Sequence, residues 1–382
     1  MARVARVEVF AADEIAVVHV MARTVRRCFL LGEDAVTGKN FDHRKLWIDD
    51  QLVHQARHFG IDLLCQAIMS NHIHLVLRSR PDVVAEWDDS EVARRWLMLC
   101  PMRRDEHRRP MEPTEFELNH IRNDKEKVAA IRNRLSDISW WMRLLSQNIA
   151  QRANKEDCEV GKFWQARYRA VRLLDETAIL ACAAYVDLNP IRAALAETIE
   201  DSDFTSGQKR ARELQESLSQ TSQSSSKTSS SEGSRDQDGS VVPSSHSARH
   251  LSPVDLSGRD AKSRTGETGP GAGETGPCSH TQGHRCSDKG FLPMSIADYL
   301  SLLDWTARQV RSDKQGATPL YLAPIFDRLG VSSEVWCHLV THFGKLFSLV
   351  AGQPNQIDGH RSKSNSHRYR ARRAARELLS SV

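Results

Sequence analysis

Two histidines, His72 and His74, are separated by a single residue, and this spacing is the clearest sign of a functional site in the chain. They lie in the run MSNHIHLVL at residues 69–77, where the apolar and β-branched residues after Asn71 predict a strand. Side chains alternate between the two faces of a strand, so both imidazoles should lie on the same face. Two adjacent imidazoles supply half of a metal site. A pair of histidines that are hydrogen-bonded on a sheet and have only a structural role would give the same pattern.

The elements expected around this strand form an α+β sandwich. Apolar periodicity, capping residues and turn residues predict the order strand, helix, strand, strand, helix, strand, helix. The corresponding residues are 15–30, 42–60, 61–69, 72–77, 136–154, 163–174 and 175–188. A charged, proline-broken stretch at 82–134 is expected to be a helical insertion. This order predicts an antiparallel sheet with helices on one face.

A second motif stands far from the histidines, in the run AYVDLNPIRA at residues 184–193, which contains Tyr185 and Asn189. Together the two motifs resemble those of the HUH (His, bulky apolar, His) transposases that use a single tyrosine. The second motif is similar in particular to that of the REP-associated tyrosine transposases. The resemblance covers about residues 10–205, with the strand histidines first and the tyrosine near the end of a late helix. The long stretch between the motifs indicates an expanded version of the family.

The resemblance implies a ferredoxin-like sandwich and an enzyme that nicks and rejoins single-stranded DNA. It implies that Tyr185 attacks a phosphodiester and holds the 5′ phosphate covalently, leaving a free 3′ hydroxyl. His72, His74 and Asn189 would bind a divalent metal, for which the family implies Mg²⁺ or Mn²⁺; imidazoles alone would also suit zinc or copper. Family members act on single-stranded DNA, commonly beside hairpins and as homodimers, which implies a cytoplasmic, nucleoid-associated protein.

Residue spacing agrees with these roles. Tyr185 and Asn189 are four residues apart, so one helix face would carry both. Two histidines and an asparagine leave positions open for substrate oxygens, as metal catalysis requires. The other tyrosine of this region, Tyr168, has Arg172 four residues on, and we expect it to pack or to stack on DNA. A core aromatic on an apolar helix remains the alternative interpretation of Tyr185.

Basic and aromatic residues near the tyrosine are candidates for DNA contacts. Arginines alternate with apolar residues before the tyrosine helix, and a tryptophan beside them could stack on bases. The candidates are Trp164, Arg167, Arg169, Arg172 and Arg192. A solvated strand face explains the first three arginines equally well, and Arg192 could instead interact with the C-terminus of the helix.

Two other functions remain open. A non-catalytic protein could use the same fold to bind hairpin DNA or to regulate, and a metal-dependent phosphodiester hydrolase could activate water while Tyr185 serves only structure. The presence of both histidines, Tyr185 and Asn189 argues against a decayed site.

Composition divides the rest of the chain. The 382 residues are 40% hydrophobic with a net charge of +4, which is ordinary for a globular protein. Residues 215–290 are rich in Ser, Thr, Gly, Pro and Gln, which predicts a disordered linker. Residues 291–382 predict a small all-α C-terminal domain with a basic tail, and the sequence assigns it no role. No CxxC pair and no apolar run of membrane-spanning length occurs, so we expect a cytoplasmic protein without a membrane partner.

Overall fold

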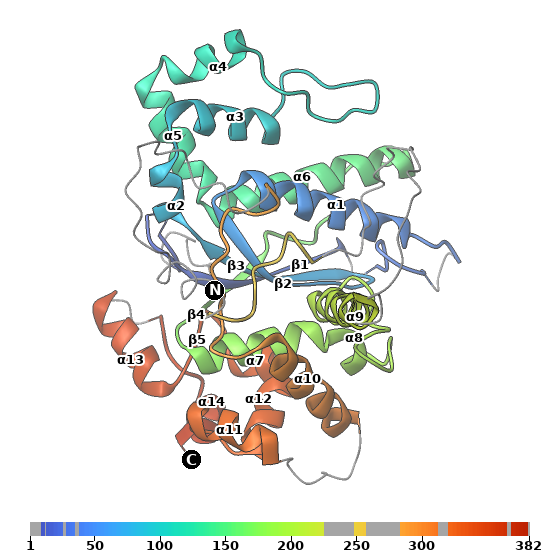
Figure 1. The fold of residues 1–382 in the computed structure, drawn as a ribbon, viewed down its shortest axis with the longest axis vertical. Helices are drawn as coiled ribbons and strands as arrows, with labels where there is room; N and C mark the ends of the chain where they lie inside the picture. Colours follow the sequence, from blue (N-terminus) through green and yellow to red (C-terminus); the bar gives the residue numbers. More distant parts are fainter. Residues whose placement is uncertain are drawn as a thin grey trace.

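The computed structural model describes residues 9–11, 13–25, 28–34, 38–224, 248–256, 283–311, 320–364 and 368–380. At its centre is a five-stranded sheet in the order β2-β3-β1-β4-β5 (Figure 1). The strands are β1 (Val17–Arg23), β2 (Ile61–Ile68), β3 (His72–Ser79), β4 (Arg169–Leu173) and β5 (Val350–Ala351). The first four pair antiparallel, and β5 pairs parallel with β4. The expected α+β class is confirmed.

The turn into the histidine strand is the one that the sequence predicts. The backbone N–H of Met69 donates to the carbonyl of His72 at 2.8 Å, which closes a hairpin around Ser70 and Asn71. Along β3, Ile73 and Leu75 are buried in one hydrophobic cluster and Val76 in another, as alternation requires. His72 and His74 therefore share the sheet face of Val76.

Helices cover both faces of the sheet, so the expectation of helices on a single face was wrong. On one face lie α1 (His43–His58) and α6 (Ile138–Asp157); on the other lie α7 (Glu176–Asp187), α10 (Ile296–Arg311) and α12 (Ser333–Leu346) (Figure 1). The physical reason is burial, because every residue of β2 is buried and an antiparallel sheet with two apolar faces needs two covers.

The expected helical insertion lies between β3 and α6. It consists of α2 (Pro81–Glu86), α3 (Asp89–Leu99), α4 (Glu115–Arg122) and α5 (Lys125–Leu135). After β4, the Asp175 carboxylate accepts the backbone N–H of Ala178 and begins α7, as its position in the sequence predicts. The short α8 (Asn189–Arg192) follows the end of α7.

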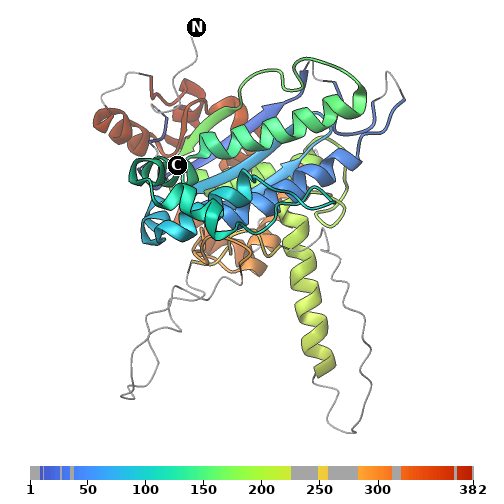
Figure 2. The same cartoon turned by 90° about the horizontal axis from the view of Figure 1, so that it is seen from above.

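Parts of the expected linker are ordered on the sheet edge, which corrects the prediction for 215–290. Helix α9 (Ser206–Ser224) extends into this range and projects from the body (Figure 2). The Ser252 N–H donates to the Leu63 carbonyl of β2 at 2.9 Å, and the Arg78 guanidinium donates to the Gly290 carbonyl at 2.8 Å. Backbone groups at the β2 edge and a buried arginine hold these segments despite their polar composition. Residues 225–247 and 257–282 of the expected linker lie outside the described residues.

The C-terminal helices share one hydrophobic cluster with the tyrosine helix. Trp336 and Phe343 of α12 and Tyr299 of α10 are buried together with Leu180 and Ala181 of α7. The remaining C-terminal helices are α11 (Ala323–Leu329), α13 (Pro354–Lys363) and α14 (Arg373–Ser380). With β5, this region also contributes to the sheet, which adds a strand to the expected all-α composition. In the part of the chain that the structure describes, no helix has both the length and the apolar character to cross a membrane.

Candidate functional site

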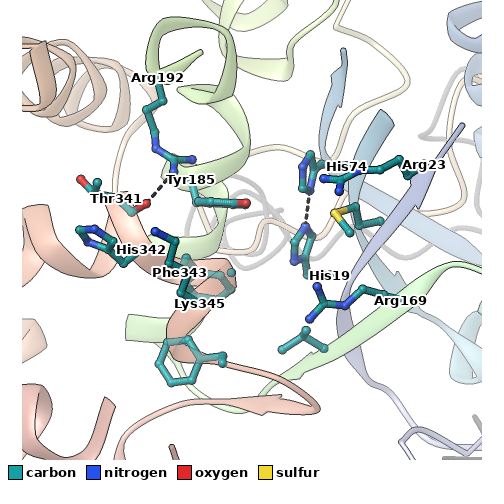
Figure 3. Close-up of a pocket in the computed structure, with 14 residues that line it drawn as sticks. His19, Arg23, His74, Arg169, Tyr185, Arg192, Thr341, His342, Phe343 and Lys345 are labelled. Carbon is teal, nitrogen blue, oxygen red and sulfur yellow. Dashed lines mark hydrogen bonds between the residues drawn. The ribbon is translucent and has the colours of Figure 1, made fainter. Parts of the chain in front are cut away.

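A pocket of about 200 Å³ lies on the α7 side of the sheet (Figure 3). Its walls come from the central strands β1, β3 and β4, from α7 and α8, and from the C-terminal half of α12. Strands supply a rigid floor and the tyrosine helix supplies one wall. The pocket thus lies where the two sequence motifs meet.

A third histidine, His19 on β1, joins the predicted pair. His19 Nε2 and His74 Nδ1 are 2.8 Å apart in a hydrogen bond, and their rings stack with centroids 5.1 Å apart (Figure 3). The ring of His72 lies 4.9 Å from that of His74. His19 is not among the residues predicted from the sequence, although alternation along β1 places His19, Met21 and Arg23 together on this sheet face.

Removal from water favours the neutral form of all three imidazoles. Burial lowers the pKa of His19 to about 3, assisted by the charge of Arg169, and the pKa of His72 to about 4, assisted by Arg23. Burial also lowers the pKa of His74 well below its ordinary value, and the two neighbouring histidines act in the same direction. Neutral imidazole is the form that binds metal ions.

Hydrogen bonds determine which nitrogen of His72 is free. His72 Nδ1 lies 2.6 Å from the side-chain oxygen of Asn71, and a carbonyl oxygen can only accept. The proton of neutral His72 is therefore on Nδ1, and Nε2 keeps its lone pair. His74 also makes its hydrogen bond through Nδ1, but the histidine partner leaves the donor undecided. His72 thus offers at Nε2 the kind of unprotonated imidazole nitrogen that can bind a metal ion.

Tyr185 reaches this histidine cluster from α7. Its hydroxyl points across the pocket toward His74 and His19, and the ring centroids lie 5.5 Å and 6.0 Å from theirs (Figure 3). Phe343 of α12 packs on the tyrosine ring at 5.7 Å, and the Arg192 guanidinium lies 4.5 Å from the ring centroid. Among the described residues, no hydrogen bond holds the Tyr185 hydroxyl, which leaves its oxygen available for chemistry.

The pocket is positively charged. Arg23, Arg169, Arg192 and Lys345 line it, and none of its lining residues is Asp or Glu. The buried Nε atoms of Arg23 and Arg192 have no hydrogen-bond partner within the described ranges, while a terminal nitrogen of Arg192 donates to the Thr341 carbonyl. Unpartnered guanidinium donors in an acid-free pocket suit an anion such as phosphate.

The structure brings only part of the predicted metal set together. His74 lines the pocket and the ring of His72 packs beside that of His74, but neither His72 nor Asn189 is among the pocket-lining residues. Helix α7 ends at Asp187 and Asn189 begins α8, so the expected relation along one continuous helix does not hold. Among the described residues, no three His, Cys, Asp or Glu side chains form a group that could hold a metal. The role of Asn189 as a third ligand stays a prediction.

The predicted DNA-binding residues divide into two groups. Arg169 and Arg192 line the pocket, whereas Arg167 is exposed before β4. Arg172 forms an ion pair with Glu14 at 2.5 Å on the other sheet face. Trp164 is buried in the α6-side cluster, where its indole N–H donates to the Ser146 carbonyl at 2.9 Å. These contacts give Arg172 and Trp164 structural roles, and their DNA contacts stay predictions that the placement disfavours.

Residues of α12 are the largest part of the pocket that sequence reasoning missed. The segment from Thr341 to Phe347 forms one wall, and a Cβ at Gly344 would lie 3.1 Å from the Tyr185 hydroxyl. The sequence predicts a helix at 333–350, but its periodicity does not indicate which surface it covers. A region without an assigned role therefore borders the predicted nucleophile.

Comparisons with known proteins give little further guidance. No family model and no curated protein matches this chain. One matching solved structure is a REP-associated tyrosine transposase bound to a REP hairpin, with 11% sequence identity and a TM-score of 0.27. The match covers 50% of this chain and 75% of the other. A TM-score this low assigns no residue of this chain a role.

Proposed function

We propose that this chain is a transposase-type enzyme that nicks and rejoins single-stranded DNA through a covalent 5′-phosphotyrosine at Tyr185. One observation carries the proposal: the Tyr185 hydroxyl, which has no hydrogen-bond partner among the described residues, faces the buried His74–His19 pair across a pocket lined with arginines and without acidic lining residues. The strand-order β2-β3-β1-β4, with α1 and α6 on one face, supports the ferredoxin-like sandwich that the motifs imply. Tyrosine, histidines and cations are the groups that a phosphotyrosine mechanism needs in one place.

The proposed metal ligands are His72 and His74, each through Nε2, with Asn189 as the third. When bound, Mg²⁺ or Mn²⁺ would polarise the scissile phosphate and stabilise its developing charge. His72 and His74 lie on strand β3, which holds their imidazoles in place. The ligands therefore need not reorganise when the reaction occurs.

The covalent step balances as an exchange of phosphodiester bonds. The Tyr185 hydroxyl gives up its proton and its oxygen forms a bond to phosphorus, while the bond to the 3′ oxygen breaks and that oxygen takes up a proton. In rejoining, a 3′ hydroxyl attacks the phosphotyrosine and the phenol regains its proton. Arg23, Arg169 and Arg192 would bind the non-bridging phosphate oxygens. The bond energy is conserved, which permits joining as well as cutting.

The substrate is proposed to be single-stranded or hairpin DNA, with the chain acting as a homodimer; both follow from the motif resemblance alone. Two rivals remain. A hydrolase would direct water at the phosphate and would need no hydroxyl in the pocket, and a non-catalytic binder would need neither the hydroxyl nor neutral histidines. The placement of Tyr185 favours the first proposal over both.

Trapping the covalent adduct tests this function. The full chain is incubated with hairpin-bearing single-stranded oligonucleotides and Mn²⁺, boiled in detergent, and examined for a DNA-linked band. Mass spectrometry of its peptides should locate the nucleotide on Tyr185. Cleavage without an adduct would support the hydrolase, and binding without cleavage would support the regulatory protein.

A substitution on α12 is expected to slow the same step. In Gly344→Val, the new side chain would crowd the Tyr185 hydroxyl, since a Cβ there lies only 3.1 Å away. Displacing a nucleophile by about 1 Å costs about 100-fold in rate, so we expect the rate of adduct formation to fall by about that factor. In Gly359→Ala on α13, the Cβ meets nothing within 4 Å, and the rate should stay at the wild-type level. An unchanged rate in a folded Gly344→Val protein would show that α12 does not restrict the tyrosine.

A further inference from the structure

The hydrogen bond between His19 and His74 has two possible directions with opposite consequences. His19 and His74 are 6% and 1% exposed, and His19 Nε2 lies 2.8 Å from His74 Nδ1. If His74 Nδ1 donates, Nε2 of His74 has no proton and can bind a metal. If His19 Nε2 donates instead, the proton of neutral His74 lies on its Nε2, which then cannot act as a ligand.

We propose that His19 is a positioning residue whose Nε2 accepts the hydrogen bond from His74 Nδ1–H, which keeps His74 Nε2 available as a donor atom in the pocket. The inference rests on the proposed function, because it assigns His19 a role toward the proposed metal ligand. A histidine that binds metal commonly donates its other ring N–H to an acceptor that fixes the tautomer and the ring orientation. Here that acceptor is a second imidazole on the neighbouring strand.

The arrangement around His72 supports this direction. The Asn71 side-chain oxygen accepts from His72 Nδ1, so His72 Nε2 is without a proton. Only the proposed direction gives His74 the same tautomer. Each of the two histidines then has one acceptor at Nδ1 and an unprotonated Nε2, and the two ring centroids lie 4.9 Å apart on one sheet face.

The position of His19 in the fold suits a residue whose role is to orient His74. It lies on β1, which is paired on both sides, with β3 and with β4. Its ring is nearly parallel to that of His74, with an angle of 12° between the planes. A hydrogen bond from a residue on a rigid strand holds a functional side chain in one geometry. His19 points from the sheet into the same pocket as Tyr185 (Figure 3).

Nitrogen NMR decides the direction without metal or DNA. The full chain is labelled with ¹⁵N-histidine, and the His74 signals are identified by their absence in His74→Gln. The proposal expects a protonated Nδ1 and an unprotonated Nε2 on His74. A protonated Nε2 in the metal-free wild-type chain would overturn it.

Two substitutions at His19 test the consequence for metal binding. Phenylalanine fills the space but cannot accept a hydrogen bond, whereas the side-chain oxygen of glutamine can. Loss of such a partner typically weakens metal binding about 10- to 100-fold, so we expect that loss of Mn²⁺ affinity in His19→Phe and recovery to within a few-fold of wild type in His19→Gln. Affinity is measured by paramagnetic resonance titration of folded proteins, with His54→Phe on α1 as a control away from the pocket.

The outcomes separate this inference from the proposed function. Equal Mn²⁺ affinity in His19→Phe and wild type, or no Mn²⁺ binding by the wild type, overturns the role of His19. Should His19→Phe fail to fold, the NMR tautomer and the His19→Gln affinity still decide. A wild-type chain that shows the expected tautomer and Mn²⁺ binding but forms no Tyr185 adduct would retain the role of His19 and lose the transposase mechanism.

Discussion

Tyr185→Phe is expected to abolish the covalent DNA adduct and to lower strand cleavage by at least about 1,000-fold, as loss of a catalytic nucleophile does. The substitution removes only the hydroxyl oxygen. The ring keeps its packing against Phe343 and beneath Arg192, so we expect the fold and the affinity for single-stranded DNA to change little. Gel quantification of adduct and cleaved oligonucleotide, with DNA binding measured in parallel, checks both statements.

Tyr168→Phe provides the matched control. The Tyr168 hydroxyl bonds to the Ser139 hydroxyl at 3.2 Å, and the ring is buried in the cluster on the α6 side of the sheet. Its loss should cost about 1 kcal/mol of stability and leave adduct formation at the wild-type level. An undiminished adduct in Tyr185→Phe, or a lost adduct in Tyr168→Phe, would show that Tyr185 is not the nucleophile.

Asp187→Ala is expected to lower the free energy of unfolding by about 3 to 5 kcal/mol, the usual cost of deleting a buried charged acceptor. The buried Asp187 carboxylate accepts the backbone N–H of Gly207 at 2.9 Å, the Tyr299 hydroxyl at 2.6 Å and the Ser206 hydroxyl. These bonds join the end of α7 to α9 and α10. Urea unfolding monitored by circular dichroism measures the change.

Two further variants show whether the loss comes from this buried network. Asp187→Asn keeps one carbonyl acceptor, so we expect a smaller loss than in Asp187→Ala. The exposed Asp201 carboxylate accepts a hydrogen bond from the nearby Thr198 hydroxyl, and Asp201→Ala should stay within about 0.5 kcal/mol of wild type. If Asp187→Ala unfolds within 1 kcal/mol of wild type, the network does not hold the tyrosine helix.

Local sequence patterns were sufficient for the elements that carry the two motifs. The strand of His72 and His74, the turn at Ser70-Asn71 and the start of the tyrosine helix at Asp175 are all where the sequence predicts them. These features depend on residues within a few positions of one another: alternation along a strand, a turn dipeptide and a capping carboxylate. The shared face of the two histidines follows from the same alternation.

Composition alone does not predict the contacts of the region after α9. A polar, glycine-rich composition predicts a linker, but His250 and Leu251 are buried against the sheet edge. Likewise, the arginines before α7 form one pattern in the sequence, yet Arg169 lines the pocket while Arg172 pairs with Glu14 on the opposite face. Which partner a side chain meets depends on elements that are distant in the sequence.

The fold class, the two motifs and the strand face of His72 and His74 could all be predicted from local patterns of residues. The hydrogen bond between His19 and His74, the position of α12 beside Tyr185 and the helices on both sheet faces depend on long-range packing. The physical reason is range: periodicity and capping act within an element, whereas these contacts follow from strand register and from packing between apolar surfaces far apart in the chain. Strand register and long-range packing are not encoded in the local residue pattern of the segments that they bring together.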